Sequence, residues 1–519
     1  MHDCYFEYYE ANGTRFFNVI LKPEKEGKFP IILWRSPYVD QFENEDESVS
    51  VKAEYESFKP FIDAGFAVIA QHCRGRGKSG GDCIPYIHER EDSNAMLDWV
   101  RTLPFYDGRI YLKGSSYCTS VWYAAAPYAD DIKGALFAVQ ISDRYNVCYT
   151  NGFLKKGLHG YWYINRMYKY KSHKKRNYAQ GTLDTLPLTG ITKEVFGEYA
   201  EDFEELIKHP DRGDDFWNTR FGGADARDAE KKAKFPMLFV SSWYDIYTGG
   251  MFDLWYSLGE ESRKQSAFAV SAYNHGDTNG ESPIKFKNGS RNEQFPLWDL
   301  KWFSYLENGG ESPFELGKIT YFTLFEDEWR VCEKLEAAKS KKITLGQGIA
   351  EYTYNPFCPS EFVGGLSRNF GATGYQRKAG ARYDILTVYS EPFENDVTVK
   401  GKIAAKLKVS TDRDDTCFLV RVSIEKEGGD YGLRDDITSV VYQHPDYIAT
   451  EWAKLDFSMD EIALQIKTGE RLRIDVASAD DAHYVRHTNN KGLFSTQTTA
   501  KIAHNKVDLG ESYILIPIE

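Results

Sequence analysis

The sequence is poor in cysteine and lacks the patterns that disulfide-rich and zinc-binding proteins use. Its 519 residues include eight cysteines, with no C-x-x-C pair and no zinc-ligand spacing. This distribution favours reduced, mostly buried thiols rather than a disulfide framework. The N-terminal segment has no basic stretch followed by an apolar run, so no secretory signal is predicted. We therefore expect a cytoplasmic protein.

Net positive charge and long apolar runs are also missing. The formal net charge is -13 at pH 7, so a polyanion would be repelled and no nucleic-acid partner is expected. No apolar run reaches about 18 residues, which predicts no transmembrane helix and no membrane partner. The 42% hydrophobic and 27% charged residues are typical of a globular protein, and the length predicts two or three domains.

Short apolar runs alternate with amphipathic helices in two parts of the chain. The runs at 29–38, 65–73, 109–114 and 132–140 indicate buried parallel strands, and 90–104 indicates a helix. Strands alternating with helices predict an α/β fold with a doubly wound sheet. The pattern returns further along, with strands expected at 235–245, 266–275 and 318–330 and helices at 249–262 and 295–309.

The two remaining regions have other textures. Residues 142–235 are rich in Tyr, Lys, Asp and Glu, and 191–209 has a helical pattern, which predicts a helical insertion. After residue 333, apolar and polar residues alternate at period two between turn residues, which predicts an antiparallel β-sandwich. The strands expected there are at 397–411, 416–427, 439–444, 469–480 and 512–518.

These textures divide the chain into three predicted domains. The α/β catalytic domain is expected at 1–141 and 236–332, the helical insertion at 142–235 and the β-sandwich at 333–519. A homodimer formed through the sandwich remains open.

The segment "GSSYCTS" (114–120) lies at the predicted turn between a strand and a helix. A nucleophilic serine in an α/β hydrolase occupies such a turn, with small residues on either side. Gly114 stands two residues before Ser116, so the spacing selects Ser116 over Ser115. The final glycine of G-x-S-x-G is replaced by Cys118, and a serine before a helix can also be an N-cap.

A nucleophilic serine needs a histidine base and a carboxylate that orients the base. Asp245 ends one predicted strand downstream of Ser116, and His275 ends the next. The order Ser, acid, His is that of α/β hydrolases, and ligand sites in open α/β sheets form at the carboxyl ends of strands. The sequence therefore predicts Ser116, Asp245 and His275 as a catalytic triad.

Several further motifs give the chain a resemblance to a known family over nearly its whole length. They are "WRSPY" (34–38), "AVIAQHCRGRGKSGGD" (67–82), "GSSY" (114–117), "WYD" (243–245), "NHGD" (274–277) and "HPDRGDDFW" (209–217). On these motifs the chain resembles the cocaine esterase-like (CocE/NonD) and X-Pro dipeptidyl-peptidase (S15) family of serine hydrolases. The resemblance implies an α/β-hydrolase core, a helical cap made by the insertion, and a jelly-roll-like sandwich.

The resemblance also implies roles for individual residues. Ser116 would attack the acyl carbon, His275 would transfer the proton and Asp245 would orient the imidazole. The oxyanion hole would consist of the Tyr38 hydroxyl and the backbone N–H of Tyr117. The expected substrate is a small-molecule ester or amide, with no cofactor and no metal.

The chain departs from the family pattern at some positions. His72 stands where Asp is usual, and Thr119 replaces a glycine after the nucleophile. Residues 246–250 include none of the carboxylates that bind an ammonium group in α-amino-acid ester hydrolases, and the chain begins almost at the hydrolase core. We therefore expect an esterase or amidase rather than an aminopeptidase. Three alternatives stay open: an X-Pro dipeptidyl-peptidase, a β-lactam or glutaryl acylase, and a catalytically degraded binding protein.

Two weaker signals have competing interpretations. The basic cluster at 169–176 is interpreted as a solvated face, although Lys174, Lys175 and Arg176 could attract an anionic acyl group. His483 and His487 have a metal-ligand spacing, but their segment lacks helical periodicity and is expected to be a structured loop.

Overall fold

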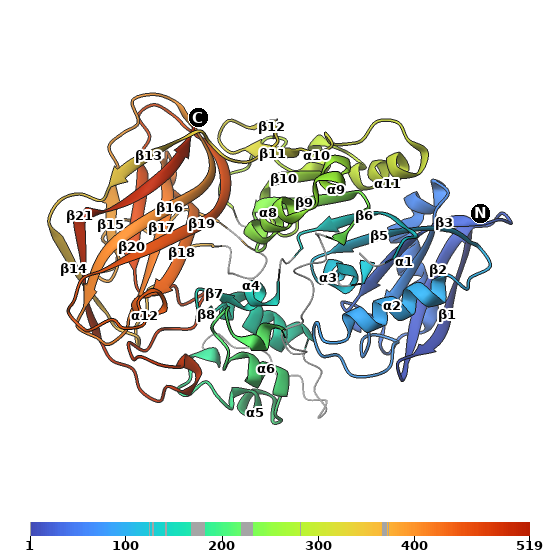
Figure 1. Ribbon diagram of the computed structural model, residues 1–519, viewed down its shortest axis with the longest axis horizontal. Coiled ribbons are helices and arrows are strands. Elements are labelled where there is room, and N and C mark those ends of the chain that lie inside the picture. The colour runs from blue at the N-terminus through green and yellow to red at the C-terminus, as the bar shows by residue number, and fades with distance from the viewer. Residues whose placement is uncertain are drawn as a thin grey trace.

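A mixed sheet forms the centre of the N-terminal part of the chain (Figure 1). The structure, a computed structural model, describes residues 2–123, 125–126, 129–140, 143–167, 182–218, 232–280, 282–365, 371 and 373–519. Within these residues the sheet has ten strands in the order β1-β2-β4-β3-β5-β6-β9-β10-β11-β12. The strands are β1 (His2–Ala11), β2 (Thr14–Pro23), β3 (Phe29–Ser36), β4 (Ala67–His72), β5 (Tyr106–Ser115), β6 (Ile132–Ala138), β9 (Met237–Tyr244), β10 (Ala267–Asn274), β11 (Ile319–Thr323) and β12 (Glu328–Cys332).

The strands from β4 to β11 pair in parallel and need cover on both faces. β4 and β9 are buried at every position, as their unbroken apolar sequences predict. Separate apolar clusters on the two faces join the sheet to different helices. One face is covered by α2 (Glu89–Val100), α3 (Tyr117–Tyr123) and α8 (Thr248–Ser257), and the other by α1 (Glu47–Asp63) and α11 (Trp298–Asn308). The predicted doubly wound sheet is confirmed.

The edges of the sheet differ from the sequence prediction. The segment 318–330, expected as one strand, is the antiparallel hairpin β11–β12. Phe325 and Asp327 between the strands have positive φ values of 64° and 60°, which turn the chain although apolar residues continue across the turn. The antiparallel hairpin β1–β2 at the opposite edge was not predicted. No helix in the described part of the chain has the length and apolar character needed to cross a membrane.

The insertion packs around its own apolar cluster and also contacts the C-terminal region. The helix expected at 191–209 is divided in two, because Gly197 adopts a left-handed conformation with φ of 77° directly after α5. Leu154 and Gly157 make backbone hydrogen bonds to Val485 and His483. The elements of the insertion are α4 (Arg144–Cys148), β7 (Tyr149–Thr150), β8 (Phe153–Leu154), η3 (Lys156–Gly160), η4 (Tyr163–Met167), η5 (Thr182–Asp184), α5 (Ile191–Phe196), α6 (Glu201–Leu206) and η6 (Asp215–Asn218).

The C-terminal region consists of two antiparallel sheets and lies at the end of the molecule opposite β1 (Figure 1). Buried and more exposed residues alternate along β16 and β19, so one face of each strand is buried, as the alternating sequence predicts. One sheet contains β13 (Lys339–Thr344), β14 (Ile349–Tyr354), β16 (Val397–Thr411), β19 (Ala453–Ile466) and β21 (Ala503–Ile518); the other contains β15 (Leu386–Tyr389), β17 (Cys417–Lys426), β18 (Gly429–Ser439) and β20 (Leu472–Ala477).

One predicted strand in this region is wrong. Most of the segment 439–444 forms the short helix α12 (Val440–Gln443). The Ser439 side chain accepts a hydrogen bond from the backbone N–H of Tyr442 and caps this turn. The cap satisfies a backbone donor locally, which competes with the strand that the Val-Val pair favours.

Candidate active site

Ser116 lies in the tight turn between β5 and α3. Its φ of 56° is in the left-handed region, which is unusual for a residue with a side chain and fits a strained turn of this type. The turn depends on Gly114, because a Cβ atom there would lie 2.4 Å from the carbonyl oxygen of Cys118. The backbone N–H of Ser116 donates to Ala138 at 2.9 Å, which ties the turn to the end of β6.

Cys118 and Thr119, which depart from the usual nucleophile turn, are accommodated within it. The backbone N–H and the hydroxyl of Thr119 both donate to the Ser116 carbonyl, at 2.9 and 2.5 Å. Cys118 is buried, and this burial raises the pKa of its thiol to about 12, so the thiol stays protonated at neutral pH. Thr119 therefore adds a bond that holds the turn closed.

Asp245 and His275 form a direct pair at the carboxyl ends of neighbouring strands. Asp245 follows β9 and His275 follows β10, and His275 Nδ1 lies 2.6 Å from Asp245 Oδ2. Asp245 is fully buried, and its other oxygen accepts the backbone N–H of Tyr247 at 2.7 Å. These contacts fix the imidazole so that its Nε2 is the atom left for proton transfer.

Tyr38 joins the loop after β3 to Ser116. Ser116 lies beside the Tyr38 hydroxyl and lowers its pKa, and Trp162 Nε1 donates to the hydroxyl oxygen at 3.0 Å. An indole N–H can only donate, so the Tyr38 oxygen accepts from Trp162 and its own proton is directed elsewhere, toward Ser116. Burial raises the pKa of Tyr38, which keeps the hydroxyl protonated.

Tyr117 has a backbone and a side chain with different surroundings. It is the first residue of α3, where backbone N–H groups have no partner within the helix. Its side-chain hydroxyl instead donates to Glu89 at 2.7 Å and accepts the backbone N–H of Tyr86 at 2.9 Å. Only the backbone of Tyr117 is therefore available to a group bound at Ser116.

Two further residues hold this arrangement, and no motif in the sequence predicted their contacts. Trp162 comes from the insertion, 124 positions from Tyr38. Arg76 is buried and donates to the carbonyl of Pro37 at 2.7 Å and to the carbonyls of Arg166 and Met167 in the insertion. Arg76 thus joins the Tyr38 loop to the insertion. Its sequence, within "RGRGKSGG", resembles a solvated loop.

The histidines with metal-ligand spacing have protein partners. His483 Nδ1 lies 2.6 Å from a carboxylate oxygen of Asp480, and His487 Nε2 lies 3.2 Å from one of Asp415. The segment between β20 and the 3₁₀ helix η9 (Phe494–Thr496) is a loop, as expected. In the described residues no three His, Cys, Asp or Glu side chains gather in a way that could hold a metal ion. The basic cluster at 169–176 lies outside the described residues.

Comparisons with known proteins cover nearly the whole chain. Residues 12–276 match the family model "X-Pro dipeptidyl-peptidase (S15 family)", and residues 336–513 match "X-Pro dipeptidyl-peptidase C-terminal non-catalytic domain". The chain is 23% identical to a cocaine esterase of Rhodococcus sp. (strain MB1 Bresler), over 98% of this chain and 96% of that protein.

Solved structures show the same fold at low sequence identity. An aminopeptidase from a marine sediment Thaumarchaeota archaeon matches with a TM-score of 0.83 at 17% identity, over 100% of this chain and 96% of that chain. An α-amino acid ester hydrolase matches with a TM-score of 0.80 at 16% identity, over 100% and 97%. The resemblance and fold predicted from the sequence are confirmed. The chain belongs to the X-Pro dipeptidyl-peptidase (S15) family and is a serine-type hydrolase.

Proposed function

We propose that the chain hydrolyses small esters or amides through an acyl-enzyme on Ser116. The observation that carries the proposal is the buried Asp245–His275 pair, 2.6 Å apart, at the sheet edge where Ser116 occupies its strained turn. A histidine held by a carboxylate is a suitable base for a serine hydroxyl.

The reaction proceeds by acyl transfer to Ser116 and then to water. Ser116 Oγ attacks the acyl carbon while His275 Nε2 takes its proton, and Asp245 stabilises the imidazolium that forms. The tetrahedral intermediate collapses as His275 returns the proton to the leaving group. Water, activated by the same histidine, then releases the acid and regenerates Ser116.

Tyr38 and the backbone N–H of Tyr117 stabilise the oxyanion of the tetrahedral intermediate. Donors that are oriented before the reaction need no reorganisation when charge develops. Trp162 acts as a positioning residue, because its N–H occupies an acceptor site of the Tyr38 oxygen and directs the hydroxyl proton toward the reacting centre.

We favour an ester or amide of a small molecule over a peptide with a free amino terminus. None of residues 246–250 carries a carboxylate beside Asp245 that could bind an ammonium group. An X-Pro dipeptidyl-peptidase activity also fits the family, and β-lactam or glutaryl acylase activity remains an alternative. A screen of p-nitrophenyl esters, Gly-Pro amides and acylated β-lactams distinguishes these substrate classes.

Rapid kinetics with p-nitrophenyl acetate test the acyl-enzyme. We expect a burst of p-nitrophenol of up to one equivalent when deacylation is slower than acylation, and trapping of the acetylated protein by acid quench. Ser116→Ala should lose both the acetylated species and turnover. Undiminished turnover in Ser116→Ala would contradict the proposal, whereas absence of acetylation and turnover in the wild-type protein would favour a degraded hydrolase that binds ligands.

The division into a catalytic domain (1–141 and 236–332), a cap (142–235) and a sandwich (333–519) is part of the proposal. It is supported by the separate apolar cluster of the cap and by the match of residues 336–513 to a non-catalytic domain.

A cytoplasmic location is supported by the eight cysteines, all of which are free thiols. Size-exclusion chromatography with light scattering would decide whether the protein is a homodimer.

A further inference from the structure

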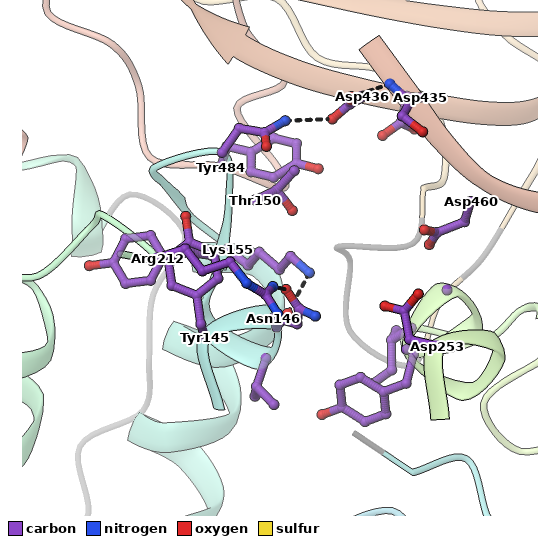
Figure 2. A pocket seen from close by; sticks show the side chains of 18 of the residues that line it. Tyr145, Asn146, Thr150, Lys155, Arg212, Asp253, Asp435, Asp436, Asp460 and Tyr484 are labelled. Atoms are coloured by element: carbon purple, nitrogen blue, oxygen red, sulfur yellow. Dashed lines mark hydrogen bonds between the residues drawn. The ribbon is translucent and has the colours of Figure 1, made fainter. Parts of the chain in front are cut away.

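A cavity of about 370 Å³ lies where the cap, the start of α8 and the sandwich meet (Figure 2). We call it the junction cavity. Lys155 and Arg212 reach it from the cap, Asp253 from α8 and Asp460 from β19 (Figure 2). Its volume is suited to a small ligand. Tyrosines supply much of the remaining wall: Tyr145, Tyr149, Tyr247, Tyr442 and Tyr484.

Most charged groups around the junction cavity have partners within the protein. Arg212 bonds Asp143 at 2.5 Å and Asn146 at 2.6 Å, and its guanidinium lies over the Tyr145 ring. Three aspartates of the sandwich wall are also satisfied: Asp435 by Arg421 at 2.7 Å, Asp456 by Lys406 at 2.7 Å, and Asp436 by the backbone N–H groups of Ile437 and Ser458 at 2.8 and 2.9 Å.

Besides Asp436, which is held by hydrogen bonds, three charged groups of the cavity have no ion pair among the described residues: Lys155, Asp253 and Asp460. Lys155 Nζ donates to the backbone carbonyl of Asn146 at 2.7 Å and meets no carboxylate there. Burial lowers the pKa of Lys155. Burial raises the pKa of Asp253, with a smaller contribution from the charge of Asp460 and an opposing one from nearby Lys402. Lys155 therefore lies on one wall of the cavity and Asp253 and Asp460 lie on the facing wall, with no ion pair between them.

The position of Asp460 is fixed by the backbone of α8. A Cβ atom at Gly249 would lie 2.1 Å from Asp460 Oδ1, so only glycine admits the carboxylate at this point. α8 has no side-chain N-cap, and the positive end of its dipole favours a carboxylate beside the first turn. The Asp460 carboxylate therefore lies directly against the first turn of α8.

We propose that the junction cavity binds a small zwitterion such as an amino acid or a dipeptide. Its ammonium group lies between Asp253 and Asp460, and its carboxylate lies against Lys155. Lys155 and Asp460 are partly buried and Asp253 is exposed at the cavity mouth, and a dipolar ligand would pair both walls at once. The tyrosine rings shield these pairs from solvent and contact the short apolar parts of the ligand.

The junction cavity is separate from the acyl-transfer site but adjoins it through one residue. Among the described residues, neither Ser116 nor His275 lines it. Tyr247 does line it, and this residue also donates its backbone N–H to Asp245 and packs its ring edge-on against His275, with ring centroids 5.5 Å apart. A bound zwitterion should therefore change kcat of ester hydrolysis without competing with the ester.

Isothermal titration calorimetry with glycylglycine tests the site directly. The full-length Ser116→Ala protein is used, so that binding is measured without turnover and stands or falls separately from the proposed function. We expect one binding site for glycylglycine. N-acetylglycylglycine, which lacks the ammonium, and glycylglycinamide, which lacks the carboxylate, should each bind at least tenfold more weakly.

Substitutions then locate the binding. Asp253→Asn and Lys155→Met should each weaken glycylglycine binding at least tenfold, whereas Lys155→Arg retains it. Asp456→Asn is the matched control, because Asp456 lines the same cavity but is paired with Lys406. Far-ultraviolet circular dichroism of each variant verifies folding. Absence of binding at millimolar glycylglycine, equal binding of the three probes, or equal affinity in Asp253→Asn and Asp456→Asn would overturn the proposal.

Discussion

The carboxyl ends of the strands and the junction cavity differ in whether their charged groups are paired within the protein. At the sheet edge, Asp245 is fully buried and bonded to His275 and to the backbone of Tyr247. In the junction cavity, Lys155 and Asp460 face each other without an ion pair. The first arrangement is complete before substrate arrives, as catalysis requires, whereas the second is completed by a ligand.

Replacing the buried carboxylate at the sheet edge should have the largest effect. Asp245→Asn retains the shape of the residue but removes the charge that stabilises the His275 imidazolium. We expect kcat for p-nitrophenyl esters to fall by about 10⁴-fold with little change in KM. Asp299→Asn, at the surface beside Lys113, serves as the control for a lost carboxylate. A decrease in kcat of less than tenfold in Asp245→Asn would contradict the proposal that Asp245 stabilises the His275 imidazolium.

Removing the Tyr38 hydroxyl should have the next largest effect. Tyr38→Phe eliminates one of the two oxyanion donors and should lower kcat by about 10²- to 10³-fold while leaving the acyl site its shape. The matched control is Tyr273→Phe, whose buried hydroxyl donates to the carbonyl of Phe286 at 2.7 Å, away from Ser116. Equal kcat values for Tyr38→Phe and Tyr273→Phe would show that Tyr38 is not an oxyanion donor.

The cap offers a third case, a buried titratable group with neither charge nor partner. His159 is 1% exposed, and neither of its ring nitrogens has a hydrogen-bond partner among the residues that the structure describes. Burial lowers its pKa from 6.5 to about 3, so the folded protein leaves it neutral where the unfolded chain binds a proton. Stability that is present above pH 6.5 is therefore lost progressively as the pH falls toward 3.

His159→Phe should remove the part of the pH dependence of stability that is due to His159 and leave the contributions of other groups unchanged. Relative to the wild-type protein, the variant should gain about 2 kcal/mol in the free energy of unfolding between pH 8 and pH 5. Urea denaturation at the two pH values measures the change. If the variant and the wild type differ in free energy of unfolding by the same amount at pH 8 and at pH 5, His159 has an ordinary pKa in the folded protein.

The smallest predicted effect concerns the indole that orients Tyr38. Trp162→Phe keeps an aromatic ring but removes one hydrogen bond, worth about 1 kcal/mol, so kcat should fall about fivefold. Trp217→Phe is the control, because Trp217 also makes a buried indole hydrogen bond in the cap, to the Asp211 carbonyl. In a Tyr38→Phe background, Trp162→Phe should have no further effect on kcat; full additivity would contradict a role through Tyr38.

Local patterns in the sequence were sufficient for much of the sheet and for the positions of its polar residues. Unbroken apolar runs predicted β3, β4 and β9, because strands covered on both faces are apolar throughout. The structure has Asp245 directly after β9 and His275 directly after β10, where the sequence placed them. The spacing from Gly114 identified Ser116, since the close approach of Cys118 excludes a side chain at 114.

What could not be predicted depends on contacts between distant segments or on single backbone angles. The bond from Trp162 to Tyr38 joins residues of the cap and the core. The junction cavity combines side chains of the cap, α8 and the sandwich, and no local pattern in these separate segments indicates a shared cavity. The hairpin β11–β12 and the break after α5 arise from positive φ values at Phe325 and Gly197, which period and composition do not reveal.

Labelling with a fluorophosphonate probe, followed by peptide mass spectrometry, tests the central claim most directly. The phosphonyl group should attach to Ser116 alone, with loss of esterase activity in proportion to labelling. Asp245→Asn should slow the labelling, and Ser116→Ala should abolish it. An unlabelled Ser116, together with ester turnover that persists in Ser116→Ala, would contradict the assignment of Ser116 as the nucleophile.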